Sequence, residues 1–241
     1  MKDEAFALME ELEEDYWWYR ARRGIVADWV SREVSAGTTV VDYGCGTGGI
    51  ARELRQRGYR LIAADVSERA LEACRQHGLD TLDLRKEALR PGMAGAFVLG
   101  DVLEHVQDDV ALLREVRAAL VDEGRVIATV PAYQFLWSGE DFVSEHVRRY
   151  GRRQLIEVFQ RAGFVVDRAT FFNALLFPAI ALDTLHKRMF RPEALFRSDI
   201  KPLPGWLNQS LYRVFSSERW WLRRLGFPFG ASLLLIATKP R

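Results

Sequence analysis

The sequence has few cysteines and no long apolar run. Only Cys45 and Cys74 occur among the 241 residues, and their spacing matches no zinc motif, so neither a disulfide scaffold nor a metal finger is predicted. The longest apolar stretch, ALLFPAIAL at 174–182, contains a proline and is about half of the ~20 residues that a membrane-spanning helix needs. The acidic N-terminus, MKDEAFALMEELEEDY, has no secretory-signal pattern. These absences favour a cytoplasmic globular protein.

The net charge of +1 hides an uneven distribution of charged side chains. Residues 1–145 contain 17 basic and 27 acidic residues, a net of −10, whereas residues 146–241 contain 17 and 6, a net of +11. The basic half could attract a phosphorylated substrate, an anionic membrane or a nucleic acid. The alternative is that the two halves attract each other or form separate solvated faces.

Strand-like and helical patterns alternate along most of the chain. Helical periodicity covers residues 5–34, and seven strands are expected, including TTVVDYG, YRLIAADVS, AFVLG, RVIATVP, FVVDRATFF and ASLLLIATKP. The segments between them, among them IARELRQRG, ERALEACRQHG, DDVALLREVRAALVDEG and GRRQLIEVFQRAG, are predicted helices. Parallel strands need crossovers of this length. The pattern therefore predicts an α/β fold: a Rossmann-like seven-stranded, mostly parallel sheet with helices on both faces.

A glycine-rich loop, VVDYGCGTGG, follows the first strand and precedes a helix. Glycines there allow a tight turn and a close approach to a ligand, and the helix N-terminus offers free N–H groups. Gly44, Gly46 and Gly49 match the dinucleotide fingerprint G-x-G-x-x-G, with Asp65 at the end of the second strand placed for ribose hydroxyls. Asp42, two residues before the first glycine, instead favours S-adenosylmethionine, because an acid there can orient the loop or meet a cationic aminoacyl end.

With these motifs, residues 38–170 resemble the class I S-adenosylmethionine-dependent methyltransferases. The resemblance rests on VVDYGCGTG, the acid in LIAADVSERAL, DVLEHV after the fourth strand and GRVIATVP as the fifth. It implies that Asp65 holds the ribose, although Asp65 could instead cap a helix, a role for which Ser67 is better suited. The chain departs from the family at AGAF, where many relatives begin the fourth strand with an acid, so the adenine contact falls to a weaker candidate, Asp83. The residues that the resemblance places around the methionine part are Gly44, Cys45, Gly46 and Gly48.

The N-terminal helix carries an aromatic and basic cluster, YWWYRARR at 16–23. Similar methyltransferases use such a helix as a lid over the cofactor, and the alternative is a helix that only packs across the sheet. As a lid, it offers Arg22 as a partner for the cofactor carboxylate, because guanidinium pairs with carboxylate in a bidentate manner. Trp18, on the same side of the helix, and Asp101, after the fourth strand, are further cofactor-binding candidates.

Three chemically versatile residues lie in DVLEHV, directly after the fourth strand. Asp101 and Glu104 have the spacing of a helix capping box. In a helical turn at the ligand-facing edge, however, Asp101, Glu104 and His105 could converge, and His146 from the loop after the fifth strand could join them. Such a set suits Mg²⁺, Mn²⁺ or Fe²⁺. Three interpretations stay open: a cap, a divalent-cation site, and His105 as a metal-free general base.

The D/E-x-x-E-H segment and the later His before RRY resemble two groups of O-methyltransferases: the ubiquinone-pathway enzymes and those that methylate the terminal ribose of small RNAs. The resemblance implies a methyltransferase acting on a hydroxyl of a small, anionic, sugar-like or amphiphilic acceptor, with Glu104, His105 and His146 at the catalytic centre. The alternatives are an N- or carboxyl-methyltransferase without metal, and a non-catalytic module that binds S-adenosylmethionine.

We expect one domain, 1–241, in four parts. These are a helical lid (1–34), a cofactor-binding core (38–172), an insertion (173–226) that forms a substrate cap or an interface, and a final strand (227–241). The insertion contains WLNQSLYRVFSSERWWLRRLGF, whose tryptophans and arginines are typical of a helix at a membrane surface, although they could also stack on nucleobases. The alternative is a plain helical cap or the contact surface of a homodimer.

Overall fold

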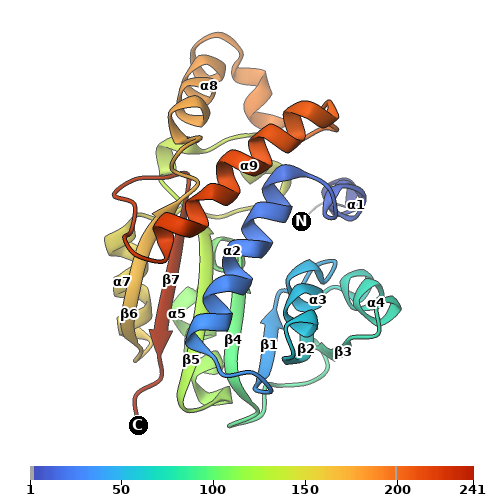
Figure 1. Ribbon diagram of the computed structural model, residues 1–241, viewed down its shortest axis with the longest axis vertical. Helices are drawn as coiled ribbons and strands as arrows, with labels where there is room; N and C mark the ends of the chain where they lie inside the picture. Colours follow the sequence, from blue (N-terminus) through green and yellow to red (C-terminus); the bar gives the residue numbers. More distant parts are fainter. Residues whose placement is uncertain (1–2, 199) are drawn as a thin grey trace.

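The computed structural model describes residues 3–198 and 200–241, and its centre is one seven-stranded sheet (Figure 1). The strands lie in the order β3-β2-β1-β4-β5-β7-β6, with β7 antiparallel to β5 and β6 and the other neighbours parallel. Their bounds are β1 Thr39–Tyr43, β2 Arg60–Asp65, β3 Asp80–Asp83, β4 Ala94–Gly100, β5 Leu120–Pro131, β6 Val165–Phe172 and β7 Ser232–Thr238. The predicted Rossmann-like α/β class is confirmed. Residues 1–2 of the expected lid lie outside the described residues.

Helices cover both faces of the sheet. They are α1 Asp3–Leu12, α2 Trp17–Glu33, α3 Gly49–Gln56, α4 Glu68–Gln76, α5 Asp109–Ala119, α6 Gly139–Val143, α7 Arg152–Arg161, α8 Phe177–Phe190 and α9 Gly205–Leu222, with short 3-10 turns η1 Leu103–His105, η2 Gln134–Leu136 and η3 Pro192–Phe196. One buried cluster joins the sheet to α5 and α7, through Leu113 and Phe159. A second joins it to α2, α3 and α9, through Ile25, Leu54 and Phe215.

The predicted helix at 108–124 extends too far. It ends at Ala119, and Leu120 already belongs to β5, where it pairs with Ala94 and is fully buried. Glu123 has φ +63°, which a right-handed helix does not allow. Burial of Leu120 in the sheet therefore outweighs the local preference for helix.

The N-terminal and C-terminal parts of the chain pack together on one face of the sheet. Figure 1 shows α2 and α9 side by side. The side chain of Asn208 on α9 accepts a hydrogen bond from the Trp17 N–H (2.9 Å) and donates one to the Asp15 carbonyl (2.8 Å). The ring of Trp17 lies 5.8 Å from that of Phe215, edge on. The expected insertion thus consists of α8, η3 and α9, and its last helix supports the base of the expected lid.

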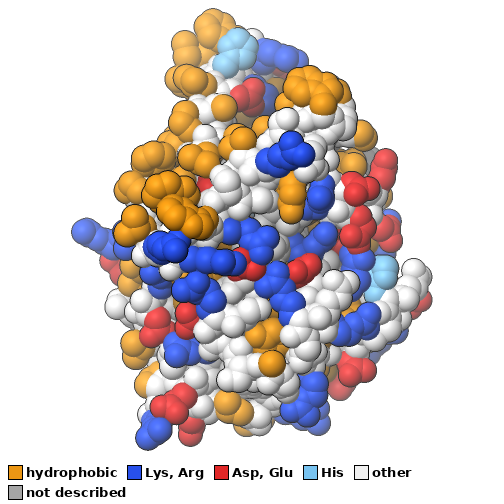
Figure 2. All heavy atoms as spheres, in the orientation of Figure 1, with side chains coloured by type: hydrophobic (Ala, Val, Ile, Leu, Met, Phe, Trp, Pro, Cys, Tyr) orange, Lys and Arg blue, Asp and Glu red, His pale blue; other side chains and the backbone are white. Residues whose placement is uncertain are grey.

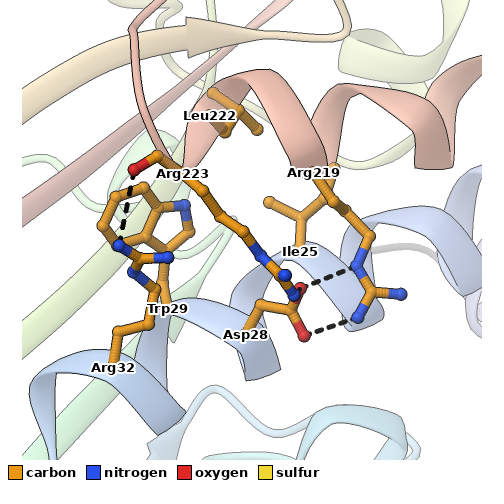
Figure 3. A pocket seen from close by; sticks show the side chains of 7 residues that line it. All are labelled: Ile25, Asp28, Trp29, Arg32, Arg219, Leu222 and Arg223. Carbon is orange, nitrogen blue, oxygen red and sulfur yellow. Dashed lines mark hydrogen bonds and ion pairs between the residues drawn. The ribbon is translucent and has the colours of Figure 1, made fainter.

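Part of the charge asymmetry is neutralised inside the molecule. The carboxylate of Asp28 on α2 accepts hydrogen bonds from Arg219 (2.8 Å) and Arg223 (2.9 Å) of the basic half, and from Arg57 directly after α3 (3.0 Å). Figure 3 shows the α9 arginines turned toward Asp28 around a small pocket. The two halves of the chain do attract each other, as one of the two interpretations held.

Candidate active site

The glycine loop between β1 and α3 has a shape that only glycine tolerates. Gly44 has φ +71°, and a Cβ added there would lie 2.7 Å from a methyl carbon of Val102. The N–H of Gly46 donates to the carboxylate of Asp65 at the end of β2 (3.1 Å). The loop is therefore closely packed and tied to the next strand, and it leads into the N-terminus of α3, as a nucleotide-like cofactor requires.

The acids at the ends of β2 and β3 lie side by side, because Asp65 and Asp83 are paired in register. Asp65 also accepts the N–H of Ser67 (2.8 Å), while the hydroxyl of Ser67 caps α4 through Ala70 N–H (3.4 Å). The helix cap is therefore Ser67, and Asp65 faces the loop. Asp83 is bound by Arg85, whose guanidinium donates to both carboxylate oxygens (2.9 and 2.8 Å), so its oxygens are already engaged.

Asp42 is a buried carboxyl beneath the loop. Among the described residues, its Oδ2 atom has no hydrogen-bond partner, and the same holds for the buried hydroxyl of Thr47. Burial raises the pKa of Asp42 to about 7. An orphaned acid beside a glycine cradle fits a cofactor that carries a cationic amino group, as S-adenosylmethionine does.

Helix α1 lies over the glycine loop. The methyl carbon of Met9 is 3.1 Å from the position that a Cβ on Gly46 would take, and the Glu13 carboxylate similarly approaches Gly49 (2.5 Å). Glu13 also forms an ion pair with Arg52 on α3 (2.9 Å). The segment expected to be a lid thus covers the loop, although neither Met9 nor Glu13 could be recognised from the sequence.

Arg22 pairs with a carboxylate of the protein itself. Its guanidinium, 4.8 Å from the centre of the Trp18 ring, donates to Asp101. Asp101 also accepts from the hydroxyl of Thr129 (3.2 Å) and has φ +58°. Asp101 is thus engaged by Arg22 and Thr129, and it is not among the three described residues whose ligand atoms meet, so its convergence with them stays a prediction. Asp101 and Glu104 do not form a capping box either: η1 has no side-chain cap, and Asp108 caps α5.

Three of the four expected metal ligands do meet. Ligand atoms of Glu104, His105 and His146 lie within 4.8 Å of one another. The rings of His105 and His146 are 4.6 Å apart, edge to face. Glu104 is fully buried, neither of its oxygens has a partner among the described residues, and burial raises its pKa well above the usual value. The site therefore offers one carboxylate and two imidazoles.

His105 is at the open side of this cluster. Of the three residues it is the exposed one, whereas Glu104 is buried and His146 is partly buried. The protein atoms packed around the ring, and then the neighbouring His146, lower the pKa of His105 to about 4. The imidazole is consequently neutral near pH 7, the form that can bind a cation or accept a proton.

Asp141 orients His146 and was missed by the sequence analysis. Its buried carboxylate lies 2.8 Å from His146 Nδ1 and accepts two hydrogen bonds from Arg149 (both 2.7 Å). Burial alone would raise its pKa, but the hydrogen bonds from His146 and Arg149 hold it well below the usual value. With Nδ1 bonded to Asp141, Nε2 is left to face His105. The available signal was the capping box of α6, formed by Ser138 and Asp141.

Comparison with known proteins defines the class. The family model for a methyltransferase domain matches residues 17–169, and the chain belongs to this family. Its fold is shared with S-adenosylmethionine-dependent methyltransferases, among them one from Mesorhizobium loti (TM-score 0.54, 19% identity, 88% of this chain and 97% of that one).

Similarity to curated proteins is low and covers only part of the chain. The ubiquinone biosynthesis O-methyltransferase of Xylella fastidiosa (strain M23) is 28% identical over 131 residues, which cover 48% of this chain and 53% of that protein. The chain thus spans about half the length of the curated relatives it matches.

Two solved structures share the fold. The first is a complex between the Haloferax volcanii Trm112 methyltransferase activator and a methyltransferase (TM-score 0.65, 19% identity, 99% of this chain and 96% of that one). The second is a Haemonchus contortus phosphoethanolamine N-methyltransferase with S-adenosylhomocysteine (TM-score 0.62, 16% identity, 100% and 59%).

Proposed function

We propose that the protein transfers the methyl group of S-adenosylmethionine to a hydroxyl oxygen of a small-molecule acceptor, and that Glu104, His105 and His146 hold a divalent cation there. The observation that carries the proposal is the cluster of three ligand atoms within 4.8 Å of one another, directly after β4. In an open α/β sheet this edge is where ligands bind.

The donor set fits a metal ion of intermediate hardness. Two imidazoles with one carboxylate suit Fe²⁺ or Mn²⁺ better than Mg²⁺, which prefers oxygen ligands. Asp141 supports the set from behind, as carboxylates commonly do for metal-binding histidines. The similarity to ubiquinone biosynthesis O-methyltransferases, although low, favours a hydroxyl acceptor.

Each part of the site has a separate task in the reaction. S-adenosylmethionine supplies the sulfonium methyl group, and a cation would lower the pKa of the acceptor hydroxyl. The glycine loop and Asp65 would hold the cofactor, and the buried carboxyl of Asp42 would interact with its cationic amino group. If His105 binds the cation, the hydroxyl proton would pass to solvent at the exposed side of the cluster, the acceptor oxygen would bond to the methyl carbon, and the sulfur–methyl bond would break. Without a cation, the neutral ring of His105 would be free to take that proton.

A second candidate retains the cofactor and omits the metal. The low pKa of His105 is compatible with a base that acts alone on a hydroxyl, an amine or a carboxylic acid. The two candidates differ in what they require of His146, which contributes to a metal site but is not needed as a base.

Calorimetry with S-adenosylmethionine, followed by transfer of a labelled methyl group to a panel of catechols, other hydroxylated compounds and amines, tests the proposal. We expect O-methylated products and turnover that EDTA abolishes and Mn²⁺ or Fe²⁺ restores. His105→Ala and His146→Ala should each weaken Mn²⁺ binding, observed by electron paramagnetic resonance, and His77→Ala provides the matched control. Turnover unaffected by EDTA and by His146→Ala would remove the metal from the proposal, and methyl groups found only on nitrogen would refute the hydroxyl acceptor.

A further inference from the structure

Helix α8 has an apolar surface that the rest of the described chain does not cover. Its sequence is FPAIALDTLHKRMF, yet Thr184 is its one buried residue. Leu182, Leu185 and Met189 have the spacing of a single helical face and are 68%, 52% and 62% exposed. A helix in a globular protein normally buries such a face. The apolar side of α8 is therefore directed at something outside the chain.

The end of α9 and the segment after it extend this apolar surface. Trp220, Trp221, Leu225 and Phe229 are each between 45% and 61% exposed. The ring of Phe229 lies 5.6 Å from that of Phe177, the first residue of α8, so the two parts are continuous. Figure 2 shows hydrophobic side chains gathered over α8 and over the segment that joins α9 to β7. We call this the α8–α9 surface.

Basic side chains accompany the α8–α9 surface. Residues 173–229 contain nine Lys or Arg against four Asp or Glu; two of the nine, Arg219 and Arg223, pair with Asp28 on α2, and one of the four acids, Glu218, is fully buried. The guanidinium of Arg224 lies 4.6 Å from the centre of the Trp220 ring, and Arg188 is adjacent to Met189 on α8. Exposed tryptophan and phenylalanine combined with arginine are typical of protein surfaces at the lipid headgroup level.

We propose that the α8–α9 surface binds the face of a bilayer that contains anionic phospholipids. The leucine, methionine and aromatic side chains would enter the boundary between headgroups and acyl chains, and the arginines would pair with phosphates. No helix within the described part of the chain has the length and apolar character needed to cross a bilayer, so this contact is peripheral.

Charge favours a lipid surface over a second copy of the chain. A two-fold dimer through this surface would bring two basic patches together, which is unfavourable. An anionic bilayer instead complements both the apolar and the basic residues. The inference concerns where the enzyme works, and it holds whichever atom of the acceptor is methylated.

Flotation of the full chain with vesicles tests the inference. We expect binding to vesicles of phosphatidylcholine with phosphatidylglycerol, weaker binding at high salt, little binding to phosphatidylcholine alone, and a blue shift of tryptophan fluorescence on binding. Leu185→Asp with Met189→Asp, and separately Arg188→Glu with Arg224→Glu, should each weaken binding by about tenfold or more. Val165→Asp is the matched control, because Val165 is 53% exposed at the start of β6 and outside the surface.

Two results would overturn the inference. One is absence of binding to anionic vesicles by a chain that still binds S-adenosylmethionine. The other is a dimer in solution, seen by light scattering, that the Leu185→Asp and Met189→Asp changes convert to monomer. S-adenosylmethionine affinity and the thermal midpoint, measured on every variant, separate loss of membrane contact from loss of folding.

Discussion

Arg22 and Asp101, 79 residues apart in the chain, form an ion pair at the junction of α2 and the sheet. The side chains of Arg22 and Asp101 are 13% and 19% exposed, so water screens the pair only weakly. The pair connects α2 to the residue after β4, two positions before the turn η1 that carries Glu104 and His105. It also engages the carboxylate of Asp101, which is not among the three described residues whose ligand atoms meet.

Removing Arg22 should weaken both folding and cofactor binding. Arg22→Ala leaves the carboxylate of Asp101 without its cation, so the free energy of unfolding should fall by about 2–4 kcal/mol and the Kd for S-adenosylmethionine should rise about tenfold. Chemical denaturation and calorimetry measure the two effects. Arg20→Ala, two residues earlier on the same helix with its guanidinium over Tyr212, is the control. Effects of Arg22→Ala and Asp101→Ala that simply add in the double variant would show that the pair is not coupled.

Gly44→Ala should destabilise the protein more than Gly37→Ala does. Both glycines have a positive φ, +71° and +79°, so both variants incur about 1–2 kcal/mol of backbone strain. A Cβ at Gly44 also meets Val102 at 2.7 Å, whereas Gly37 has nothing within 4 Å. We expect an additional loss of about 1–3 kcal/mol at Gly44, measured by urea denaturation, and partial recovery in the Gly44→Ala, Val102→Ala double variant. Equal losses at the two positions would argue against close packing of the loop.

The free energy of unfolding should depend on pH through Asp28. Despite the opposing effect of burial, hydrogen bonds from Arg219, Arg223 and Arg57 lower the pKa of Asp28 from 3.8 to about 2. Because the folded-state pKa is the lower one, the stabilisation is fully present above about pH 4 and is lost as the pH falls toward 2. After allowance for solvent screening, about 1–2 kcal/mol is at stake. Denaturation as a function of pH should show a shallower slope in this window for Asp28→Asn, and an unchanged slope would contradict the prediction.

Asp141→Asn should weaken metal binding without removing a ligand. The amide cannot accept hydrogen bonds at both of its ends, so His146 loses its orientation, and Mn²⁺ affinity should fall about 10–100-fold. Electron paramagnetic resonance titration measures the affinity. The matched control is Asp108→Asn, which makes the same chemical change at the cap of α5, where asparagine works nearly as well. Equal Mn²⁺ affinity in the wild type and Asp141→Asn would show that Asp141 serves only the fold.

The parts of the structure that follow from short-range patterns were predictable. The glycine loop, the strand before it and the acid at the end of β2 lie within about 25 residues of one another, and each has a signature that local sterics or hydrogen bonding demands. Ser67 was correctly preferred over Asp65 as the cap of α4 because serine at that position is directly before the helix. The histidine after β5 was placed near His105 because both follow neighbouring strands.

The parts that depend on distant partners were not predictable. Asp101 is directed by Arg22 and Thr129, and the end of α5 is set by the pairing of Leu120 with Ala94, neither of which local periodicity contains. The contact of Met9 with the glycine loop depends on where α1 lies in the folded chain, which the sequence pattern does not contain. Asp141 has the spacing of a cap residue of α6, and this local role gives no indication of its hydrogen bond with His146.

The two hydrogen bonds of Asn208 join α9, near the C-terminus of the chain, to the start of α2 and the residues before it. Helix α9 carries Trp220 and Trp221 of the α8–α9 surface near its end, and near its start Asn208 holds the residues that join α1 to α2. The apolar surface and the segment that approaches the glycine loop are therefore anchored on the same helix.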